Sequence, residues 1–424
     1  MTNPVFVMGD DLTGAIDTGI YFRKGFSRVK VGFRTEEPWD FMQPADVIQV
    51  YDAESRNLSS AEAGARMGYA ASLLPPDLHP RVYHKVDATL RGNLGSEISA
   101  ILQGLGRSAA ILAPAFPAIG RTVVNGHLHV DGVPLEQTMF SRDPLHPVKT
   151  SDIGEVVAGT TTVSVLPLSL AVIRKGSSEI LQYIMDRGRA PAIYIADTAE
   201  DRDLIALAEA CAPSDLILPC GSGGLARQVA SYWTARGNRK DQDQDEALPL
   251  CDRVIVAIGS AHPESHKQLT ALSQLREAYS VVLAPHQLAP VSARYMEEIR
   301  HGVLSDSSSL VTVALGADRV SSQYSGELTV LLANIVADKL KQWRARSSRE
   351  RLGVIATGGE TALAVAKALD VKAVWPEGNI SAGIPWSRLQ FLPSEDDMIL
   401  VSKAGSFGSP NTLADIALTM VGRK

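Results

Sequence analysis

Cysteine, aromatic residues and long apolar runs are all scarce in this sequence. Its three cysteines, Cys211, Cys220 and Cys251, are not spaced like metal ligands. So few cysteines in a chain of 424 residues disfavour a disulfide scaffold and predict a reducing cytoplasm. No run approaches the ~18–20 apolar residues of a membrane span. The N-terminal residues lack a basic region followed by a long apolar stretch, so no signal peptide is expected.

Positive charge is not in excess either. The 41 Lys and Arg residues are outnumbered by 47 Asp and Glu residues, which gives a formal net charge of −6. Such a chain has no basic field for nucleic acid or for an anionic membrane. An anionic small-molecule substrate would have to be held by local Lys, Arg and backbone N–H groups. The sequence leaves the oligomeric state open, a homo-oligomer included.

Several familiar active-site motifs are missing. The sequence has no Walker A motif and no GxSxG elbow, and the helical pair His262 and His266 lacks the glutamate of HExxH. His127 and His129 lie two apart without a third ligand and are interpreted as structural. The stretch CGSGGLA (220–226) formally fits a dinucleotide pattern, but no strand ending in an acid follows ~20 residues later, so a tight strand-to-helix turn is favoured.

The sequence does contain a repeated alternation of short apolar strands with helix-period segments. Helices are expected at Ser59 to Leu74 and at Leu94 to Leu105. Continuous apolar strands are typical of a parallel sheet that is covered on both faces, so an α/β fold with mainly parallel sheets is predicted. The strands expected in the first half are VFVMGD, ADVIQVYD, RVYHKVD, SAAILAPAF, APAIYIADT and SDLILPCG.

A polar segment divides the chain. Residues 235–249, ARGNRKDQDQDEALP, have a dense charge cluster and no apolar periodicity, which predicts a linker with a boundary near Gln242. The α/β pattern then restarts in RVIVAIGS, SLVTVALG, LGVIATGG and MILVSKAG. Two domains are therefore expected, residues 1–241 and 242–424, as the chain length also favours.

Three strands of the second half end in glycine-bearing turns that precede helices. In VIATGGETALAVAKAL, the turn 357–361 offers close backbone approach and unpaired helical N–H groups, which suit phosphate. Similar turns are Gly259-Ser260, before a helix with Pro263 near its first turn, and 403–408, before a helix expected to be capped near Ser409. Each turn alone could be an ordinary β-to-α connection. Together, on one sheet edge, they indicate a nucleotide, with Lys403 adding positive charge.

Two adjacent carboxylates, Asp10 and Asp11, follow the first strand of the chain. At such a junction one of them can cap the helix while the other faces a cleft. An Asp that faces a cleft can accept a proton from a substrate hydroxyl. Both acids serving as caps is the alternative.

Polar clusters follow two further strands of the first half. In YHKVDATLRGN, Lys85 and Arg91 are suited to hold a carboxylate, and Asp87 is suited to hydrogen-bond sugar hydroxyls. The second cluster, in QVYDAESRNL, consists of Asp52, Ser55 and Arg56. For each of the two clusters, the alternative is a solvated charged loop without a binding role.

The segment 114–147 is rich in Pro, Gly and polar residues. Within it, Gly120-Arg121-Thr122 is expected to reach the substrate, and GHLHVDGVPL alternates like a hairpin.

These motifs together resemble the four-carbon acid sugar kinases over nearly the whole chain. The resemblance rests on GDDLTGAIDTG, HKVDATLRGN, PAFPAIGRTVVNGHL, ATGGETA and VSKAGSFG, in that order. It implies an N-terminal domain for a sugar acid, a C-terminal domain for ATP, and phosphorylation of the terminal hydroxyl of D-threonate, D-erythronate or a 3-oxo-tetronate. By motif, it implies substrate contacts at Asp11, Arg56 and the 85–88 stretch, and ATP contacts at Ser260, the 357–361 loop and Gly405.

Three positions depart from the pattern of many relatives: Gly9 stands where they have Ala, Ala88 where they have Ser, and Glu360 where they have Asp. The missing Ser hydroxyl at position 88 bears on which sugar acid is used. The longer side chain of Glu360 bears on whether this residue has a role in magnesium binding. The residues predicted to bind substrate are Asp11, Asp52, Arg56, Lys85, Val86, Asp87, Ala88, Arg91 and Arg121. The residues predicted to bind ATP are Ser260, Thr357, Gly358, Gly359, Glu360, Thr361, Lys403, Ala404 and Gly405.

The predicted mechanism places the active site in an interdomain cleft. Asp11, or less favourably Asp10, takes the proton of the terminal hydroxyl, and Mg²⁺ bridges the phosphates of ATP. Two alternatives remain at this point. One is a nicotinamide-dependent sugar-acid dehydrogenase that uses the CGSGGLA turn, and the other is a non-catalytic sugar-acid sensor.

Overall fold

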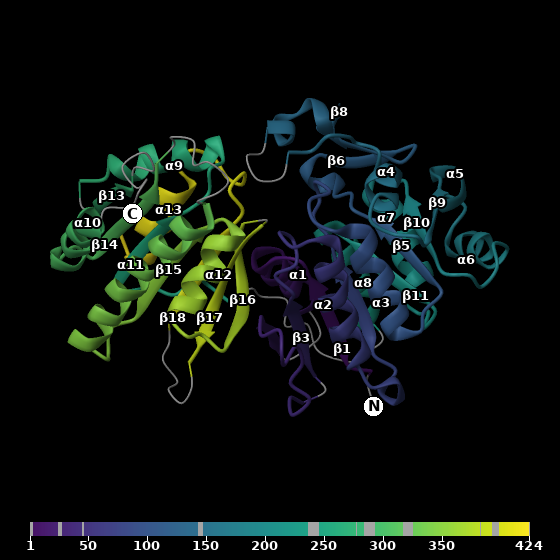
Figure 1. The fold of residues 1–424 in the computed structure, drawn as a ribbon, viewed down its shortest axis with the longest axis horizontal. Helices are drawn as coiled ribbons and strands as arrows, with labels where there is room; N and C mark the ends of the chain where they lie inside the picture. The colour runs from purple at the N-terminus through teal and green to yellow at the C-terminus, as the bar shows by residue number, and fades with distance from the viewer. Residues whose placement is uncertain are drawn as a thin grey trace. The chain divides into compact units, whose positions relative to one another are not determined.

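The computed structural model describes residues 3–23, 28–44, 46–142, 147–235, 246–276, 278–283, 293–316, 325–381, 383–391 and 398–423. The chain separates into two compact units, Met1–Asp243 and Gln244–Lys424, coloured purple to teal and teal to yellow in Figure 1. The boundary predicted at Gln242 lies outside the described residues. The separate binding roles of the two domains stay a prediction.

A parallel sheet forms the centre of the first unit, in the order β2-β3-β1-β4-β11-β5-β10-β9. The strands at its centre are fully buried and mostly apolar, as the sequence predicts for a sheet covered on both faces. The strands are β1 (Val5–Gly9), β2 (Arg28–Gly32), β3 (Val47–Asp52), β4 (Arg81–Lys85), β5 (Ala109–Ala113), β9 (Ser164–Leu168), β10 (Ala192–Ala196) and β11 (Ile217–Gly221). All six strands predicted for this half are confirmed.

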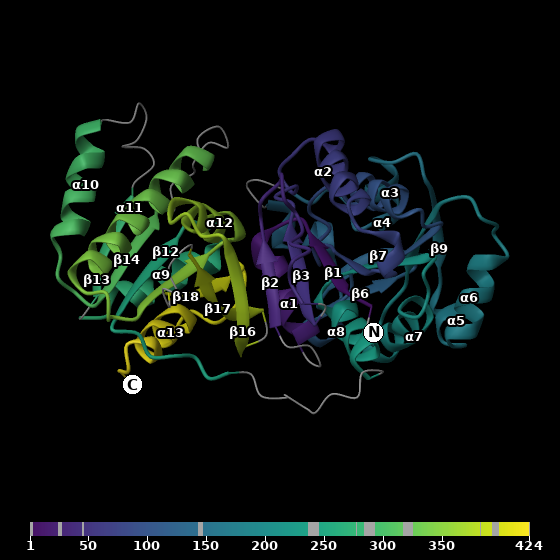
Figure 2. The ribbon, with the colours of Figure 1, turned by 90° about the horizontal axis from the view of Figure 1, so that it is seen from below.

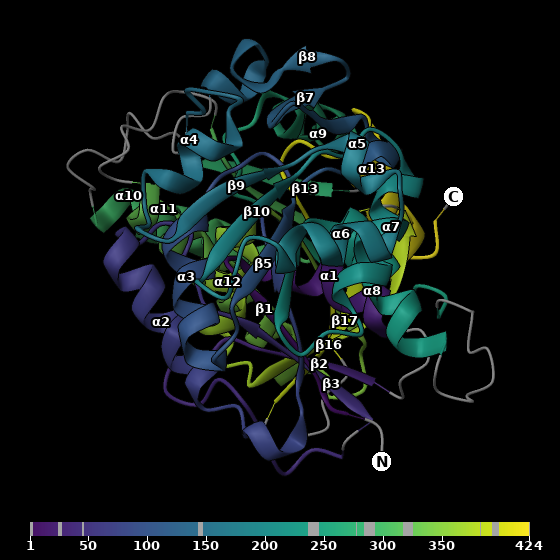
Figure 3. The same cartoon turned by 90° about the vertical axis from the view of Figure 1, so that its right-hand side faces the viewer.

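Helices cover both faces of this sheet. Figures 2 and 3 show α2, α3 and α4 on one face, and α1, α7 and α8 on the other. Both helices predicted in this half are confirmed, as α2 and α3. The helices are α1 (Leu12–Arg23), α2 (Ser60–Ser72), α3 (Leu94–Leu105), α4 (Ile153–Ala158), α5 (Leu170–Ile173), α6 (Ser177–Met185), α7 (Asp201–Cys211) and α8 (Gly223–Ala235), with short 3₁₀ turns at Pro76–Leu78, Pro117–Ile119, Leu135–Gln137 and Met139–Arg142.

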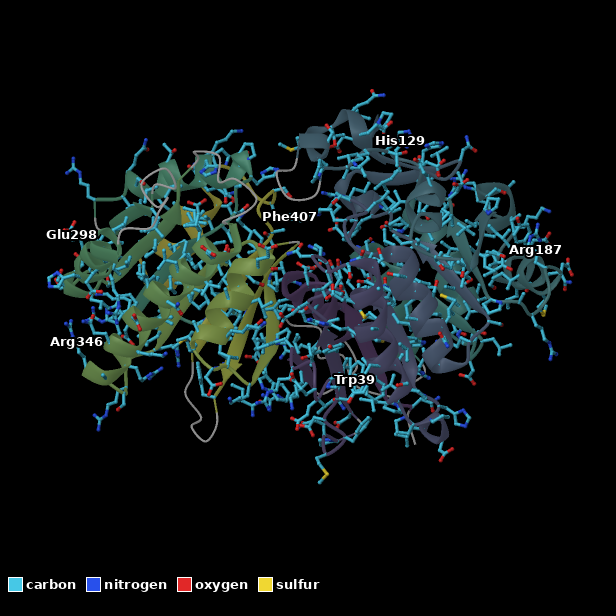
Figure 4. The ribbon with its side chains drawn as sticks, viewed as in Figure 1. Trp39, His129, Arg187, Glu298, Arg346 and Phe407 are labelled. Carbon is cyan, nitrogen blue, oxygen red and sulfur yellow. The ribbon has the colours of Figure 1, made fainter. Side chains whose placement is uncertain are left out.

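A small antiparallel sheet extends from the loop after β5. It contains β6 (Arg121–Val124), β7 (His127–Val130) and β8 (Val133–Pro134), so the hairpin predicted in GHLHVDGVPL is confirmed. An isolated bridge between Val123 and Thr198 connects it to the segment after β10. Figure 4 labels His129 on this small sheet.

The second unit contains a mixed sheet in the order β13-β14-β12-β15-β18-β17-β16. The first five strands pair in parallel and the last two pairings are antiparallel. The four strands predicted here are confirmed as β12, β14, β15 and β18. The strands are β12 (Arg253–Ile258), β13 (Ala278–Leu283), β14 (Leu310–Leu315), β15 (Leu352–Thr357), β16 (Ala373–Ser381), β17 (Ile384–Gln390) and β18 (Met398–Lys403).

Helices again lie on both faces. Figure 2 shows α11 and α12 on one side of this sheet and α9 and α13 on the other. Pro263 occupies the first turn of α9, as predicted, whereas α13 begins at Thr412 after Asn411, later than the cap expected near Ser409. The helices are α9 (Pro263–Ser273), α10 (Ala293–Ser305), α11 (Ser325–Arg346), α12 (Gly359–Ala368) and α13 (Thr412–Met420).

Candidate functional site

In the first unit, the carboxyl ends of the central strands lie side by side. Gly9 of β1 is in register with Asp52 of β3 and with Lys85 of β4, and Lys85 is in register with Gly221 of β11. In an open α/β sheet this is the edge where ligands bind. The loops after β1, β3 and β4 carry most of the residues predicted to contact the substrate.

Arg56 is the centre of an ion-pair network at this edge. Its Nε and Nη2 donate to the two carboxylate oxygens of Asp10 at 2.7 and 2.9 Å, and its Nη2 also donates to Asp11 at 2.6 Å. Asp11 Oδ1 also accepts the N–H of Gly14 at 3.2 Å, so it caps α1 as predicted for one of the pair. Burial opposes the charge of Arg56, but Asp10, Asp11 and Asp87 outweigh burial and raise its pKa well above the ordinary value.

A second pair lies next to the first. Arg91 grips Asp87 with its Nε and Nη2 at 2.9 and 3.0 Å, and Thr89 donates its hydroxyl to the same carboxylate. Burial alone would raise the pKa of Asp87, but Arg91 and Arg56 hold it well below its ordinary value. The two-pronged contact expected of Arg91 is therefore present, with the carboxylate of its own loop as partner.

Lys85 differs from both arginines. Its side chain is 6% exposed, and the structure gives it no hydrogen bond or ion pair to any other described residue. A Cβ built on Gly14 would lie 2.9 Å from Lys85 Nζ and 2.6 Å from Asp11 Oδ1, so the ammonium lies over the first turn of α1. A buried ammonium is costly unless an anion approaches it, which suits Lys85 to hold a substrate carboxylate.

The other predicted substrate residues have different environments. Asp52 is fully buried, and its pKa is raised well above the ordinary value by burial, to which Asp11 and Asp10 add. Val86 lies in the apolar core and donates its N–H to Gly221. Ala88 is half-buried, with no side-chain hydrogen-bonding group. Arg121 has a pKa lowered by burial, and the field of Asp87 reaches it.

The backbone at this edge adopts conformations that side chains disfavour. Gly92 has φ +96°, and a Cβ there would lie 3.0 Å from Asp10 Oδ2. Glu54 and Leu90 also have positive φ, at 49° and 62°, although neither is glycine. Such strained positions cluster at functional sites, because the surrounding structure has to enforce them.

A buried polar chain beneath Arg56 was not predicted from the sequence. Ser55 Oγ donates to Glu97 Oε1 at 2.6 Å, and Glu97 Oε2 lies 3.5 Å from His84 Nε2. Asn93 donates to the carbonyls of Ser55 and Leu58 at 3.1 and 3.0 Å. These contacts fix the loop that presents Arg56. The signal in the sequence was a glutamate on the apolar face of a helix.

In the second unit, three predicted turns meet at one sheet edge. Ile258 of β12, Thr357 of β15 and Lys403 of β18 are in register. A Cβ on Gly259 would overlap the hydroxyl of Thr361, and a Cβ on Gly405 would overlap the hydroxyl of Ser260. The glycines are therefore needed for the close approach of these turns, as the sequence predicted.

The N-terminus of α12 lies at this meeting point. Its N-cap residue is Gly358, at φ +102°, which supplies no side-chain hydrogen bond to the first turn. Gly359 is half-buried, and the following Glu360 is exposed. Uncapped N–H groups at a helix N-terminus form an anion site, and the residues present here fit a phosphate group.

Lys403 is engaged within its own turn. The fully buried ammonium donates to the carbonyls of Ala404, Gly405 and Phe407 at 2.9, 3.4 and 3.0 Å. Burial lowers the pKa of Lys403 to about 8, which Glu264 partly opposes. This geometry favours a role in shaping the turn, which carries Phe407 (Figure 4), over a direct contact with phosphate.

The CGSGGLA turn connects β11 to α8 by close packing. A Cβ on Gly221 would lie 2.6 Å from the carbonyl of Ala113, and a Cβ on Gly224 would lie 2.7 Å from that of Ala115. These glycines face protein backbone, which fits the predicted tight turn and disfavours a nicotinamide dehydrogenase.

Other residues considered as metal ligands have structural contacts. His262 accepts the N–H of Glu264 and caps α9, and His127 contacts Ser151 Oγ at 3.2 Å. Within the described ranges no group of three or more His, Cys, Asp or Glu side chains is placed to hold a metal ion. None of the helices in these same ranges has the length and apolar character needed to cross a membrane.

Two family models match the chain, one in each half. A sugar-binding N-terminal domain matches residues 5–229, and a nucleotide-binding C-terminal domain matches residues 255–413. The first match includes the Arg56 network, and the second includes the glycine turns.

Curated relatives match over nearly the full chain. A D-threonate kinase of Salmonella typhimurium is 31% identical over 97% of each chain. A D-erythronate kinase of Heliobacterium modesticaldum is 26% identical over 98% of each. A 3-oxo-tetronate kinase of Pseudomonas fluorescens is 28% identical over 96% of each.

Two solved structures share the fold. A Salmonella typhimurium protein described as a tRNA synthase has a TM-score of 0.76 at 20% identity, covering 98% of this chain and 99% of its own. A Haemophilus influenzae protein has a TM-score of 0.70 at 21% identity, covering 98% of this chain and 100% of its own. At this identity the likeness concerns the fold alone.

Proposed function

Because the chain belongs to the four-carbon acid sugar kinase family, we propose that it transfers the terminal phosphoryl group of ATP to the terminal hydroxyl of a four-carbon sugar acid. Sugar-acid kinase activity follows from the family. The proposal adds ATP as donor, and D-threonate, D-erythronate or a 3-oxo-tetronate as the candidate acceptors, after the names of the relatives.

The observation that carries the proposal is the set of charges at the first unit's sheet edge. Arg56 and Arg91 each form hydrogen-bonded ion pairs with carboxylates of the protein. Lys85, in contrast, is a buried cation without a hydrogen bond or ion pair in the described part of the chain. Lys85 is therefore suited to the substrate carboxylate. The Arg56 network is suited to the hydroxyls, because its carboxylates have further lone pairs.

In the second unit, the glycine turns would hold the nucleotide. The uncapped start of α12 suits the phosphates, with Ser260, Thr361 and Gly405 forming the closely packed wall beside it. Mg²⁺ bound to the phosphates would neutralise charge during transfer and keep several waters. That arrangement is compatible with the lack of a metal-binding cluster among the described residues.

The sequence named Asp11, and less favourably Asp10, as the group that takes the hydroxyl proton. That assignment stays a prediction, because both carboxylates are hydrogen-bonded to Arg56 and Asp11 also caps α1. Exchange of either residue for Asn would break the Arg56 network as well as remove a base.

The test is an ADP-release screen over four-carbon sugar acids and their oxo forms, with ATP and Mg²⁺ present. We expect one acid or a small set to release ADP with a matching amount of phosphorylated product. No ADP above the background of ATP hydrolysis with any acid of the panel would overturn the proposal. An absorbance change with a nicotinamide cofactor would instead favour a dehydrogenase.

A further inference from the structure

Asp17 is the one charged residue of α1 before Arg23 that the mechanism above does not use. Its side chain is half-buried, and Oδ1 is enclosed by the protein without a hydrogen-bond partner. The structure gives its carboxylate no hydrogen bond or ion pair in the described part of the chain. An acid without a partner in such a place is costly to the fold, which points to a ligand.

The neighbourhood of Asp17 contains a second group without a partner. Gly14 lies one helical turn before Asp17, and the ammonium of Lys85 lies over Gly14, with Asp11 Oδ1 beside it. The charge of Lys85 acts on Asp17 and favours its ionised form. Asp17 and Lys85 are not bonded to each other, and a ligand group with both donor and acceptor atoms would satisfy both of them. A hydroxy acid offers such a group.

We propose that Asp17 contacts the sugar acid and takes the proton of the hydroxyl that is phosphorylated. The proposal rests on the kinase function proposed above. The O–H bond breaks and its proton goes to the Asp17 carboxylate, while the hydroxyl oxygen forms a bond to the terminal phosphorus of ATP. The bond from that phosphorus to the bridging oxygen breaks, and its electron pair leaves with ADP. Asp17 afterwards releases the proton to water.

The other carboxylates at this edge are less suited to the step. Asp10 and Asp11 neutralise Arg56, and Asp87 is gripped by Arg91. Asp52 is 0% exposed, which disfavours it as the base but leaves its predicted substrate contact untested. Asp17 combines partial exposure with a carboxylate that no described residue engages.

The acidity of Asp17 fits a base that works near neutral pH. Burial raises its pKa from the ordinary value of 3.8 to about 6, although Lys85 lowers it, and Asp11 adds to the rise. A base whose pKa lies near the working pH is ionised and still basic enough to take a proton. Tyr21, one turn later on α1, is also a neighbour of Asp17, and Tyr21 in turn feels the charge of Arg227 of α8, which is paired with Asp201 at 2.6 Å.

The experiment compares the wild type with Asp17→Asn and Asp11→Asn, with the sugar acid found in the screen. We expect Asp17→Asn to lower kcat by about 10²–10⁴-fold, the usual contribution of a general base. The wild-type kcat/KM should fall as the pH decreases below about 6, which forms the acid limb of its pH profile. In Asp17→Asn this acid limb should be absent. Binding of an ATP analogue, measured by titration, should stay within about twofold.

Unfolding measurements keep the test independent of folding. Asn removes a buried charge, so Asp17→Asn should melt no lower than the wild type, which a merely structural Asp17 would not allow. A variant that keeps near wild-type kcat and the acid limb would overturn the proposal. If Asp11→Asn alone abolishes the limb, Asp11 is the base. A wild type inactive on every acid would instead refute the kinase substrate class, and is distinguishable because no variant is needed to see it.

Discussion

At the scale of single residues, Arg56 contacts several carboxylates of the predicted substrate site at once. It neutralises Asp10, which is 3% exposed, and Asp11, and it lies 3.9 Å from Asp87. A buried ion pair adds little net stability, but removal of one partner leaves an uncompensated charge. Arg56 is therefore needed by the fold, in addition to its predicted contact with the substrate.

Exchange of Arg56 for Met should destabilise the protein and abolish activity. We expect the free energy of unfolding to fall by roughly 3–5 kcal/mol, the usual cost of breaking a buried pair, as measured by urea unfolding. Arg56→Lys keeps the charge but loses the two-pronged contact, so its unfolding free energy should lie between the two. Wild-type stability in Arg56→Met would contradict the network.

Exchange of Lys403 for Met should affect the turn that it organises. Three backbone carbonyls lose a charged donor, and we expect a loss of roughly 1–3 kcal/mol in unfolding free energy. The KM for ATP should rise because Gly405 is no longer held, with little change in the KM for the sugar acid. A raised KM for ATP with unchanged stability would instead favour direct contact with phosphate.

The raised pKa of Asp17 predicts that the stability difference between the wild type and Asp17→Asn changes with pH. Its folded-state pKa of about 6 lies above 3.8, so the folded protein binds this proton more tightly than the unfolded chain does. The stabilisation is present below about pH 4 and is lost as pH rises through about 6, by at most roughly 3 kcal/mol. Asp17→Asn should therefore gain more Tm over the wild type at about pH 8 than at about pH 4, in thermal melts. Equal gains at both pH values would contradict a raised pKa.

At the scale of elements, the glycine turns of the second unit explain the geometry of the predicted nucleotide site. Gly358 at φ +102° begins α12, and Gly405 lies where any Cβ would overlap Ser260. Both positions follow from the need to bring three strand ends and one helix start together.

Exchange of Gly405 for Ala should raise the KM for ATP by about tenfold or more, since the turn has to move away from Ser260. The KM for the sugar acid should stay nearly constant. Gly326→Ala is the matched control, because Gly326 lies in the first turn of α11 and a Cβ there meets no atom within 4 Å. If both variants have wild-type KM for ATP, the turn is not part of the nucleotide site.

The sequence predicted those elements whose physics is local. Strands with continuous apolar runs and helices such as α2 and α3 were found because burial on both faces leaves a clear pattern. β16 and β17 were missed because Pro376, Glu377 and Pro385 interrupt their apolar pattern, although the two strands follow each other in the chain and pair with each other.

The same division holds for the candidate site. Register at the strand ends places Asp52, Lys85 and the Asp10–Asp11 pair at one sheet edge, as strand order and parallel pairing imply. The partners of Lys403 and the unpaired state of Asp17 depend on side-chain packing over many residues. No local pattern encodes these features, although a single acid in an otherwise uncharged stretch of helix was a signal.

At the scale of the whole molecule, each unit has its own apolar core. One core cluster includes Phe6, Tyr51 and Ile98, and another includes Val254, Trp386 and Met420. The two cores lie in separate compact units. Such units are expected to fold independently.

Separate expression of residues 1–241 and 242–424 tests this independence. We expect both fragments to unfold cooperatively, with the sugar acid raising the Tm of the first and ATP raising that of the second. Neither fragment alone should produce ADP from the sugar acid. A first fragment that ATP stabilises, or a second that the sugar acid stabilises, would contradict the assigned roles.

Gly14, Gly92 and Gly405 have an evolutionary consequence. At each of them an added Cβ would crowd a group of the predicted sites, namely Lys85, Asp10 and Ser260. A lineage that drifts in sequence can exchange most of its surface, but one added methyl group at any of these three positions displaces one of these groups. Natural variation among functioning descendants should therefore halt at these positions, even where the neighbouring residues have changed beyond recognition.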